Sequence, residues 1–169
     1  MLRISRLIDG AINRIGTAAA WAVFPLIAVV LIDVVSRRVF NQATAWGHET
    51  AYMIYGFLWV MGIAYTLLHK AHTRIDVFVL RLPEKPRLMI DLLGFLVFFG
   101  VFAVVFVLEG FEFARMAWAK METSGSTAWN PPLYPLKTVL PVGFVLLLVQ
   151  GISECIKEAG LLVKGRKSS

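Results

Sequence analysis

Long apolar segments alternate with short polar segments along this chain. A helix crosses the ~30 Å hydrocarbon core of a bilayer with about 20 mainly apolar residues. Charges that flank a somewhat shorter apolar window can still reach the membrane interface. Windows without Asp, Glu, Lys or Arg cover residues 15–32, 50–69, 92–108 and 138–153.

This pattern predicts an all-α membrane protein in which residues 1–169 form a single membrane domain. Pro25 predicts a kink in the first span, and Pro141 is expected in the first turns of the last one. The third helix is expected to project past the membrane to about residue 122, before a segment rich in Gly and Pro ends it. The four transmembrane helices are expected at about 17–37, 47–69, 87–110 and 136–157.

Residues 2–15 show a helical pattern of their own, with apolar side chains on one broad face and Arg3, Arg6, Asp9, Asn13 and Arg14 on the other. Such a helix suits the membrane surface, where apolar groups enter the acyl boundary and guanidinium groups meet phosphates. We therefore predict an N-terminal interfacial amphipathic helix that lies in the membrane plane. The alternative is that this segment simply continues the first span.

Composition supports a membrane location, since 58% of the residues are hydrophobic and the mean hydropathy is +0.71. The net charge of +6 is unevenly spread. Of the Lys and Arg residues, 12 fall in the two termini and the second connection, and 5 fall on the other side. The positive-inside rule then predicts that both termini are cytoplasmic. The basic residues indicate attraction to anionic lipid rather than binding of nucleic acid.

Candidate chemistry is sparse. The charged residues of the spans lie near their ends, whereas a pump or channel needs polar groups at depth. His48 and His69 fall at opposite ends of one predicted helix, which disfavours a haem, and the single cysteine, Cys155, excludes an internal disulfide. No nucleophile triad, phosphate loop or zinc spacing occurs. We expect no enzymatic activity, no metal and no cofactor in this chain.

The polar stretch between the first two spans, DVVSRRVFNQATAWGHETAYM, stands out against this background. Asp33 and Arg37 are four residues apart with the acid first, which favours a helical ion pair. Two interpretations remain open for Arg37, Arg38 and Glu49. They neutralise one another across the hairpin as ordinary interfacial charges, or they lock the hairpin into a shape that a partner protein recognises.

The motifs DVVSRRVFN (33–41), AWGHE (45–49) and GIAYTLLHKAHTRIDVF (62–78), with PVGFVLLLVQGISE (141–154), are together distinctive. In this order and spacing the chain resembles the small, DctQ-like membrane subunit of tripartite ATP-independent periplasmic (TRAP) transporters. The loop STAWNPPLYP is not a feature of that resemblance.

The resemblance implies a non-catalytic subunit of the bacterial inner membrane that enlarges the scaffold of a large membrane subunit and helps to dock a periplasmic solute-binding protein. Sodium coupling is then expected in the large subunit, with uptake of a small organic solute, often a carboxylate. Residues expected to contact the partner or to shape the structure are Asp33, Arg37, Arg38, Asn41, Trp46, Glu49, His72, Arg74 and Asp76. Alternative functions are the membrane anchor of a redox complex and a small autonomous transporter.

Overall fold

The computed structural model describes residues 2–69 and 100–167. Every regular element in these two ranges is a helix. The helices are α1 (Leu2–Ala20), α2 (Val23–Val39), α3 (Gly47–Leu68), α5 (Val101–Ala119) and α6 (Tyr134–Lys167).

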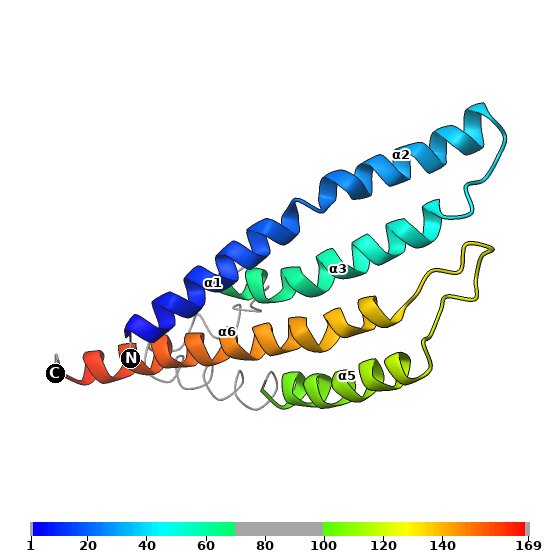
Figure 1. Ribbon diagram of the computed structural model, residues 1–169. Helices are drawn as coiled ribbons and strands as arrows, with labels where there is room; N and C mark the ends of the chain where they lie inside the picture. Colours follow the sequence, from blue (N-terminus) through cyan, green and yellow to red (C-terminus); the bar gives the residue numbers. More distant parts are fainter. Residues whose placement is uncertain (1, 70–99, 168–169) are drawn as a thin grey trace, which may run out of the picture.

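Four of these helices lie side by side in the order α2, α3, α6, α5, as Figure 1 shows. Helix α1 packs against both α3 and α6, where these two helices contact each other. The first turn of α1 and the last turn of α6 lie at one end of the molecule, which we call the terminal end (Figure 1). The connections over residues 40–46 and 120–133 lie at the opposite end, which we call the loop end.

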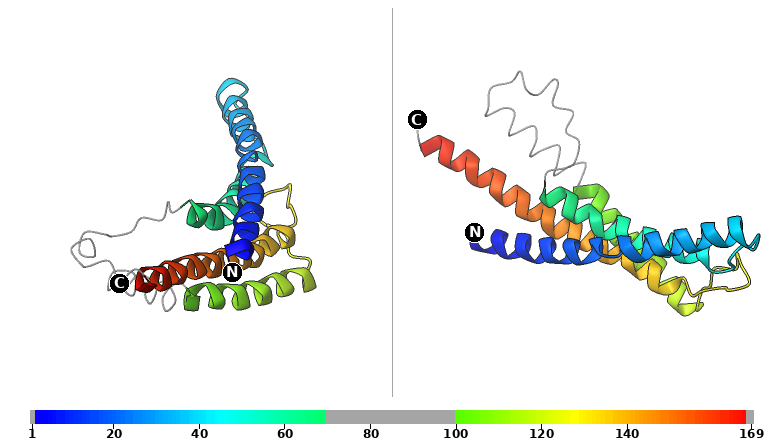
Figure 2. Two further views of the ribbon diagram at one scale, coloured as in Figure 1. Left: turned by 90° about the vertical axis from the view of Figure 1, so that its left-hand side faces the viewer. Right: turned by 90° about the horizontal axis from the view of Figure 1, so that it is seen from above.

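Helices α1 and α2 follow one another along nearly one line, with a short break at Trp21 and Ala22 (Figures 1 and 2). Proline has no N–H to donate to the carbonyl four residues earlier and clashes with it. For Pro25 that carbonyl belongs to Trp21, which instead accepts from Phe24 N at 3.2 Å. The kink that Pro25 predicts therefore lies one turn before the proline.

The expected interfacial helix over residues 2–15 is not a separate element, because α1 runs on to Ala20 and leads straight into α2. Its expected apolar face is also divided. Ile12 is buried against the bundle, whereas Leu7 is 74% exposed. The stripe that packs is Ser5, Asp9, Ile12, Gly16 and Ala19, in which two members are polar. This geometry favours the alternative in which the segment continues the first span.

The centre of the molecule is a small apolar core between α1, α3, α5 and α6. Its buried residues include Ala64, Ala103, Phe144 and Leu147. Small residues let the backbones of neighbouring helices approach closely. A Cβ added at Gly143 would lie 2.9 Å from the carbonyl oxygen of Val60, so the contact of α3 with α6 depends on that glycine.

Within residues 2–69 and 100–167, three segments are long and apolar enough to cross a membrane: Ser5–Val39, Gly47–Leu68 and Tyr134–Lys157. They correspond to the predicted first, second and fourth spans. Residues 87–99 of the predicted third span lie outside the described residues, and α5 covers the rest and ends at Ala119, slightly before the expected position. Pro141 lies inside α6 rather than at its start, because that helix already begins at Tyr134.

Candidate functional site

The polar residues of the loop end begin with Asp33, near the end of α2. Arg37 Nε donates to Asp33 Oδ2 at 2.9 Å, which is the ion pair that the spacing predicts. The other carboxylate oxygen of Asp33 accepts a short hydrogen bond from Thr44 Oγ1 in the connection to α3. A Cβ at Gly47 would lie 2.8 Å from Asp33 Oδ1, so only glycine permits this close contact at the start of α3.

Glu49 lies in the first turn of α3 and is only 6% exposed. Its carboxylate accepts hydrogen bonds from two hydroxyl groups of the distant connection between α5 and α6. Thr127 Oγ1 donates at 2.9 Å, and Ser124 Oγ donates a shorter bond. The interpretation in which Glu49 neutralises the arginines across its own hairpin is therefore wrong. Arg37 pairs with Asp33, and Glu49 accepts its hydrogen bonds from the loop between α5 and α6.

The loop that Glu49 contacts is shaped by its own hydrogen bonds. Ser124 N donates to Pro131 O at 3.0 Å, and Gly125 N donates to Asn130 Oδ1 at 2.7 Å. Gly125 has φ +63°, a left-handed conformation that glycine adopts without a steric penalty. These hydrogen bonds fix the shape of the loop, so that the hydroxyl groups of Ser124 and Thr127 both reach the carboxylate of Glu49.

The remaining predicted residues of the loop end are exposed. Asn41 has φ +50°, in the left-handed region that asparagine tolerates better than most residues, and it follows the end of α2. Trp46 immediately precedes α3, and its carbonyl accepts from Thr50 Oγ1 at 2.8 Å. Arg38 makes no ion pair within the described part of the chain. His72, Arg74 and Asp76 lie outside the described residues.

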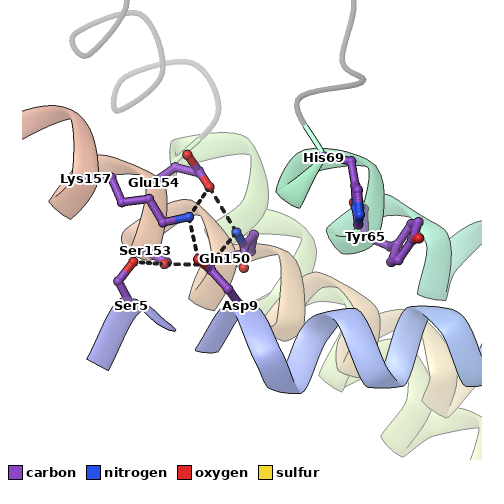
Figure 3. A network of polar contacts seen from close by, with 8 residues as sticks. All are labelled: Ser5, Asp9, Tyr65, His69, Gln150, Ser153, Glu154 and Lys157. Atoms are coloured by element: carbon purple, nitrogen blue, oxygen red, sulfur yellow. Dashed lines mark hydrogen bonds and ion pairs between the residues drawn. The ribbon is translucent and has the colours of Figure 1, made fainter. Parts of the chain in front are cut away.

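A second polar cluster, which the sequence did not predict, joins α1 to α6 near the terminal end (Figure 3). Lys157 Nζ lies 2.7 Å from Asp9 Oδ2 and 2.6 Å from Glu154 Oε1, so one ammonium group is shared by two carboxylates. Gln150 Nε2 donates to both acids, to Asp9 Oδ1 at 3.1 Å and to Glu154 Oε1 at 3.2 Å.

Two serines extend this cluster toward the start of α1. Ser153 Oγ donates to Asp9 Oδ1 at 3.0 Å and lies 2.7 Å from Ser5 Oγ. Ser5, Gln150 and Ser153 are almost fully buried. Counting only Asp, Glu, Lys and Arg hides these uncharged polar residues, so the window 138–153 appears purely apolar in the sequence. The sequence interpretation was wrong about Asp9, which faces α6 rather than lipid headgroups.

An exposed ion pair near the end of α5 provides a contrast. Arg115 donates to both carboxylate oxygens of Glu112, at 2.9 and 2.5 Å, as their spacing predicts. These hydrogen bonds and the nearby guanidinium charge lower the pKa of the Glu112 carboxyl. The pair touches no other element through these bonds, so it supports one helix rather than the arrangement of several.

The described site thus consists of carboxylates held by hydroxyl, amide, ammonium and guanidinium groups, an arrangement suited to fixing helices in place. Comparison with known proteins gives its context. Residues 26–160 match the family model of the DctQ component of tripartite ATP-independent periplasmic transporters. The chain belongs to this DctQ family. It is also similar to the sialic acid TRAP transporter small permease protein SiaQ of Vibrio cholerae serotype O1, with 27% identity over 165 residues, 96% of this chain and 90% of that protein.

The region that matches the DctQ family includes the whole loop end, with Asp33, Glu49, Ser124 and Thr127. It begins after α1, so Ser5 and Asp9 lie outside the match while their partners on α6 lie within it. The cluster at the terminal end therefore joins a part of the chain that the family model matches to a part that precedes it. The likeness to SiaQ covers both parts.

Proposed function

We propose that this chain is the small permease subunit of a TRAP-type importer in the bacterial inner membrane. It acts as a non-catalytic scaffold that stabilises a large membrane subunit. It also helps a periplasmic solute-binding protein to dock while the large subunit carries out sodium-coupled uptake. Membership of the DctQ family and the exposed apolar helices support this proposal.

The observation that carries the proposal is the apolar helix α2, in which no residue is buried by the part of the chain that the structure describes. Apolar helices that their own chain leaves uncovered need lipid or another membrane protein around them. A fixed wall beside a moving transport domain needs such surfaces, held at constant depth by residues at the membrane interface. The two polar clusters would keep this wall in one shape.

The loop end is proposed to face the periplasm and the terminal end the cytoplasm, in line with the positive-inside distribution. Exposed groups at the loop end, including Arg37, Arg38 and Trp129, then offer a surface for the solute-binding protein. Arg, Trp and Tyr are frequent in protein contacts of this kind. A carboxylate is proposed as the solute, because the name of SiaQ refers to sialic acid, a carboxylated sugar.

Reconstitution tests the scaffold role. The large subunit, the binding protein and this chain are combined in liposomes with a sodium gradient, and uptake of a radiolabelled carboxylate is measured. Omitting this chain is expected to abolish uptake while the binding protein still binds its solute in solution. Full uptake without this chain would contradict the proposal, and solute flux through this chain alone would favour an autonomous transporter.

Glu49 gives a finer test of assembly. Glu49→Ala removes the carboxylate that joins α3 to the loop between α5 and α6, so the shape of the periplasmic surface should change. We expect less large subunit to co-purify with the variant than with the wild-type chain. His48→Ala is the control, because His48 is an exposed neighbour on the same helix turn. Unchanged assembly and uptake with Glu49→Ala would contradict this role.

A further inference from the structure

One face of α5 carries a stripe of exposed residues with the spacing of a helix-packing surface. Its members are four, three and four residues apart, which places them along one side of a helix. Phe102, Phe106 and Phe113 are 50%, 37% and 44% exposed, and Glu109 is exposed between them. We call Phe102, Phe106, Glu109 and Phe113 the α5 seam.

Glu109 is the charged residue of α5 that lies farthest from the loop end. Its neighbour Gly110 packs on Pro141 of α6, where an added Cβ would lie 3.3 Å from the proline Cβ. Pro141 is seven residues after Tyr134, the first residue of the apolar segment Tyr134–Lys157, so it lies about 10 Å along the helix from that end. A charged side chain at such a depth is costly unless a partner compensates it.

Glu109 has no such partner within the described part of the chain. Nearby cations are already engaged: Lys137 Nζ lies 2.6 Å from Glu122, and Arg115 binds Glu112. Every other carboxylate whose side chain the structure describes has a hydrogen bond or an ion pair; these are Asp9, Asp33, Glu49, Glu112, Glu122 and Glu154. Glu109 is therefore the one described acid that still lacks a donor.

The aromatic members of the seam are held firmly from behind by α6. The ring centroids of Phe106 and Phe144 are 4.7 Å apart, and Phe102 meets the same ring at 6.3 Å. Lys137 Nζ lies 4.0 Å from the centroid of the Phe113 ring. Rings fixed in this way form a pre-shaped surface and lose little side-chain entropy when another helix packs on them.

We propose that the α5 seam is the docking surface for one helix of the large membrane subunit, which carries a Lys or Arg opposite Glu109. This inference rests on the proposed function. Apolar side chains of that helix pack on the phenylalanines, and its cation completes the ion pair that Glu109 lacks. Lipid is the less suitable occupant, because acyl chains offer no donor at this depth and headgroup ammonium groups lie at the interface.

Photo-cross-linking in the assembled complex tests which surface meets the large subunit. A benzophenone amino acid is incorporated at Phe106, on the seam, or at Val104, which is similarly exposed but lies on another side of α5. We expect adducts with the large subunit several-fold more often from position 106 than from position 104. Equal yields, or adducts only with lipid or with residues 70–99 of the same chain, would overturn the proposal.

Charge substitutions test the ion pair. Glu109→Lys is expected to lower the large subunit that co-purifies with this chain by tenfold or more, since it places like charges together, and Glu109→Gln by a smaller factor. Glu112→Gln is the matched control, with an expected change of less than about twofold, because Glu112 is exposed and already has a partner, Arg115, on its own helix. The thermal stability of each variant, purified without the large subunit, shows whether the chain itself still folds.

The outcomes separate the seam from the proposed function. If the wild-type chain does not co-purify with the large subunit, the proposed function fails. If the wild-type chain co-purifies and folded Glu109→Lys does so equally well, the seam proposal alone fails. A Lys→Glu or Arg→Glu change in the cross-linked helix of the large subunit should restore assembly with Glu109→Lys, and the absence of any such rescue would contradict the pairing.

Discussion

The two ends of this molecule both bury carboxylates, but they compensate the charge in different ways. At the loop end, Glu49 is held by neutral hydroxyl groups from a loop. At the terminal end, Asp9 and Glu154 share the ammonium group of Lys157. Hydroxyl donors let a carboxylate order a loop, whereas an ion pair joins two helices and leaves a strong charge imbalance when one member is lost.

This difference predicts that the terminal end is the more sensitive to a single substitution. Lys157 of α6 is shared by Asp9 of α1 and Glu154 of α6, whereas Gln150 and Ser153 donate to these carboxylates as neutral groups. Removing Lys157 therefore removes compensating charge that the neutral donors cannot replace. The loop end has the short bond from Thr44 to Asp33, the Arg37–Asp33 ion pair and the hydrogen bonds within the loop in addition to Glu49. Losing one of these contacts leaves the others in place.

The largest effect is expected from Lys157→Met, which leaves Asp9 and Glu154 close together without their cation. Because these groups are partly buried, we expect a loss of about 2–3 kcal/mol of stability. That corresponds to a fall in melting temperature of roughly 5–10 °C in detergent, measured by fluorescence-detected thermal unfolding. Lys157→Arg keeps the charge and should lose much less.

The control for Lys157→Met is Arg115→Met, which breaks the exposed Glu112–Arg115 pair. Exposed ion pairs contribute about 0–1 kcal/mol, so its melting temperature should stay close to that of the wild type. Equal falls in melting temperature for the two substitutions would show that the shared ammonium group of Lys157 contributes no more stability than an exposed ion pair does.

Glu49→Ala is expected to have the next largest effect, and a local one. The hydroxyl groups of Ser124 and Thr127 lose their acceptor, at a cost of about 1–2 kcal/mol. Hydrogen exchange of the backbone amides over residues 124–130 should become roughly tenfold faster, since 1.4 kcal/mol corresponds to a factor of ten. Amides of α1 should keep their protection.

His48→Ala is the matched control for this measurement, because His48 is exposed in the same turn of α3. It should leave exchange in the loop unchanged. Faster exchange throughout α1 and α6 with Glu49→Ala would mean that the two ends unfold together. It would contradict the expectation that Glu49 stabilises the loop end alone.

A smaller effect is expected at the terminal end from Ser153→Ala. Asp9 keeps Lys157 and Gln150, but the buried Ser5 hydroxyl loses its partner, at a cost of about 1 kcal/mol. The double variant with Ser5→Ala should cost less than the sum of the two single variants, because each removes the same contact. Strict additivity in this thermal unfolding cycle would show that the two hydroxyls do not interact.

The contacts that could be predicted from the sequence are the local ones. Asp33–Arg37 and Glu112–Arg115 follow from helical spacing, and the start of α3 at Gly47 follows from the apolar pattern. The family resemblance also depends on motifs that can be read along the chain, and the family match confirms it.

Contacts between distant segments could not be predicted in this way. The partners of Asp9 on α6 are more than 140 residues away, and only the packing of α1 onto α6 brings them together. Glu49 was recognised as unusual, but its partners, Ser124 and Thr127, depend on how the second loop folds. The sequence predicted that residues 2–15 lie in the membrane plane, whereas α1 packs on the bundle and leads into α2. The packed stripe mixes Ser5 and Asp9 with apolar residues, so hydrophobicity alone does not identify the face that packs.

The smallest expected effect is a gain in stability at the loop end, from Met121→Gly. Met121 has φ +47° and follows Lys120, the C-cap residue of α5. Glu122 N donates to Ala117 O at 3.0 Å, and Met121 N donates to Trp118 O at 3.2 Å. This pair of bonds is the helix-ending motif in which glycine is usually found at the left-handed position. Glycine removes the steric cost of that conformation but adds freedom to the unfolded chain, so the net gain should be about 0.5 kcal/mol. Ala119→Gly, inside the last turn of the same helix, should instead destabilise the protein by up to about 1 kcal/mol. Opposite changes in melting temperature for the two variants would show that backbone conformation limits the stability of the loop end of α5. A fall in melting temperature with Met121→Gly would contradict this.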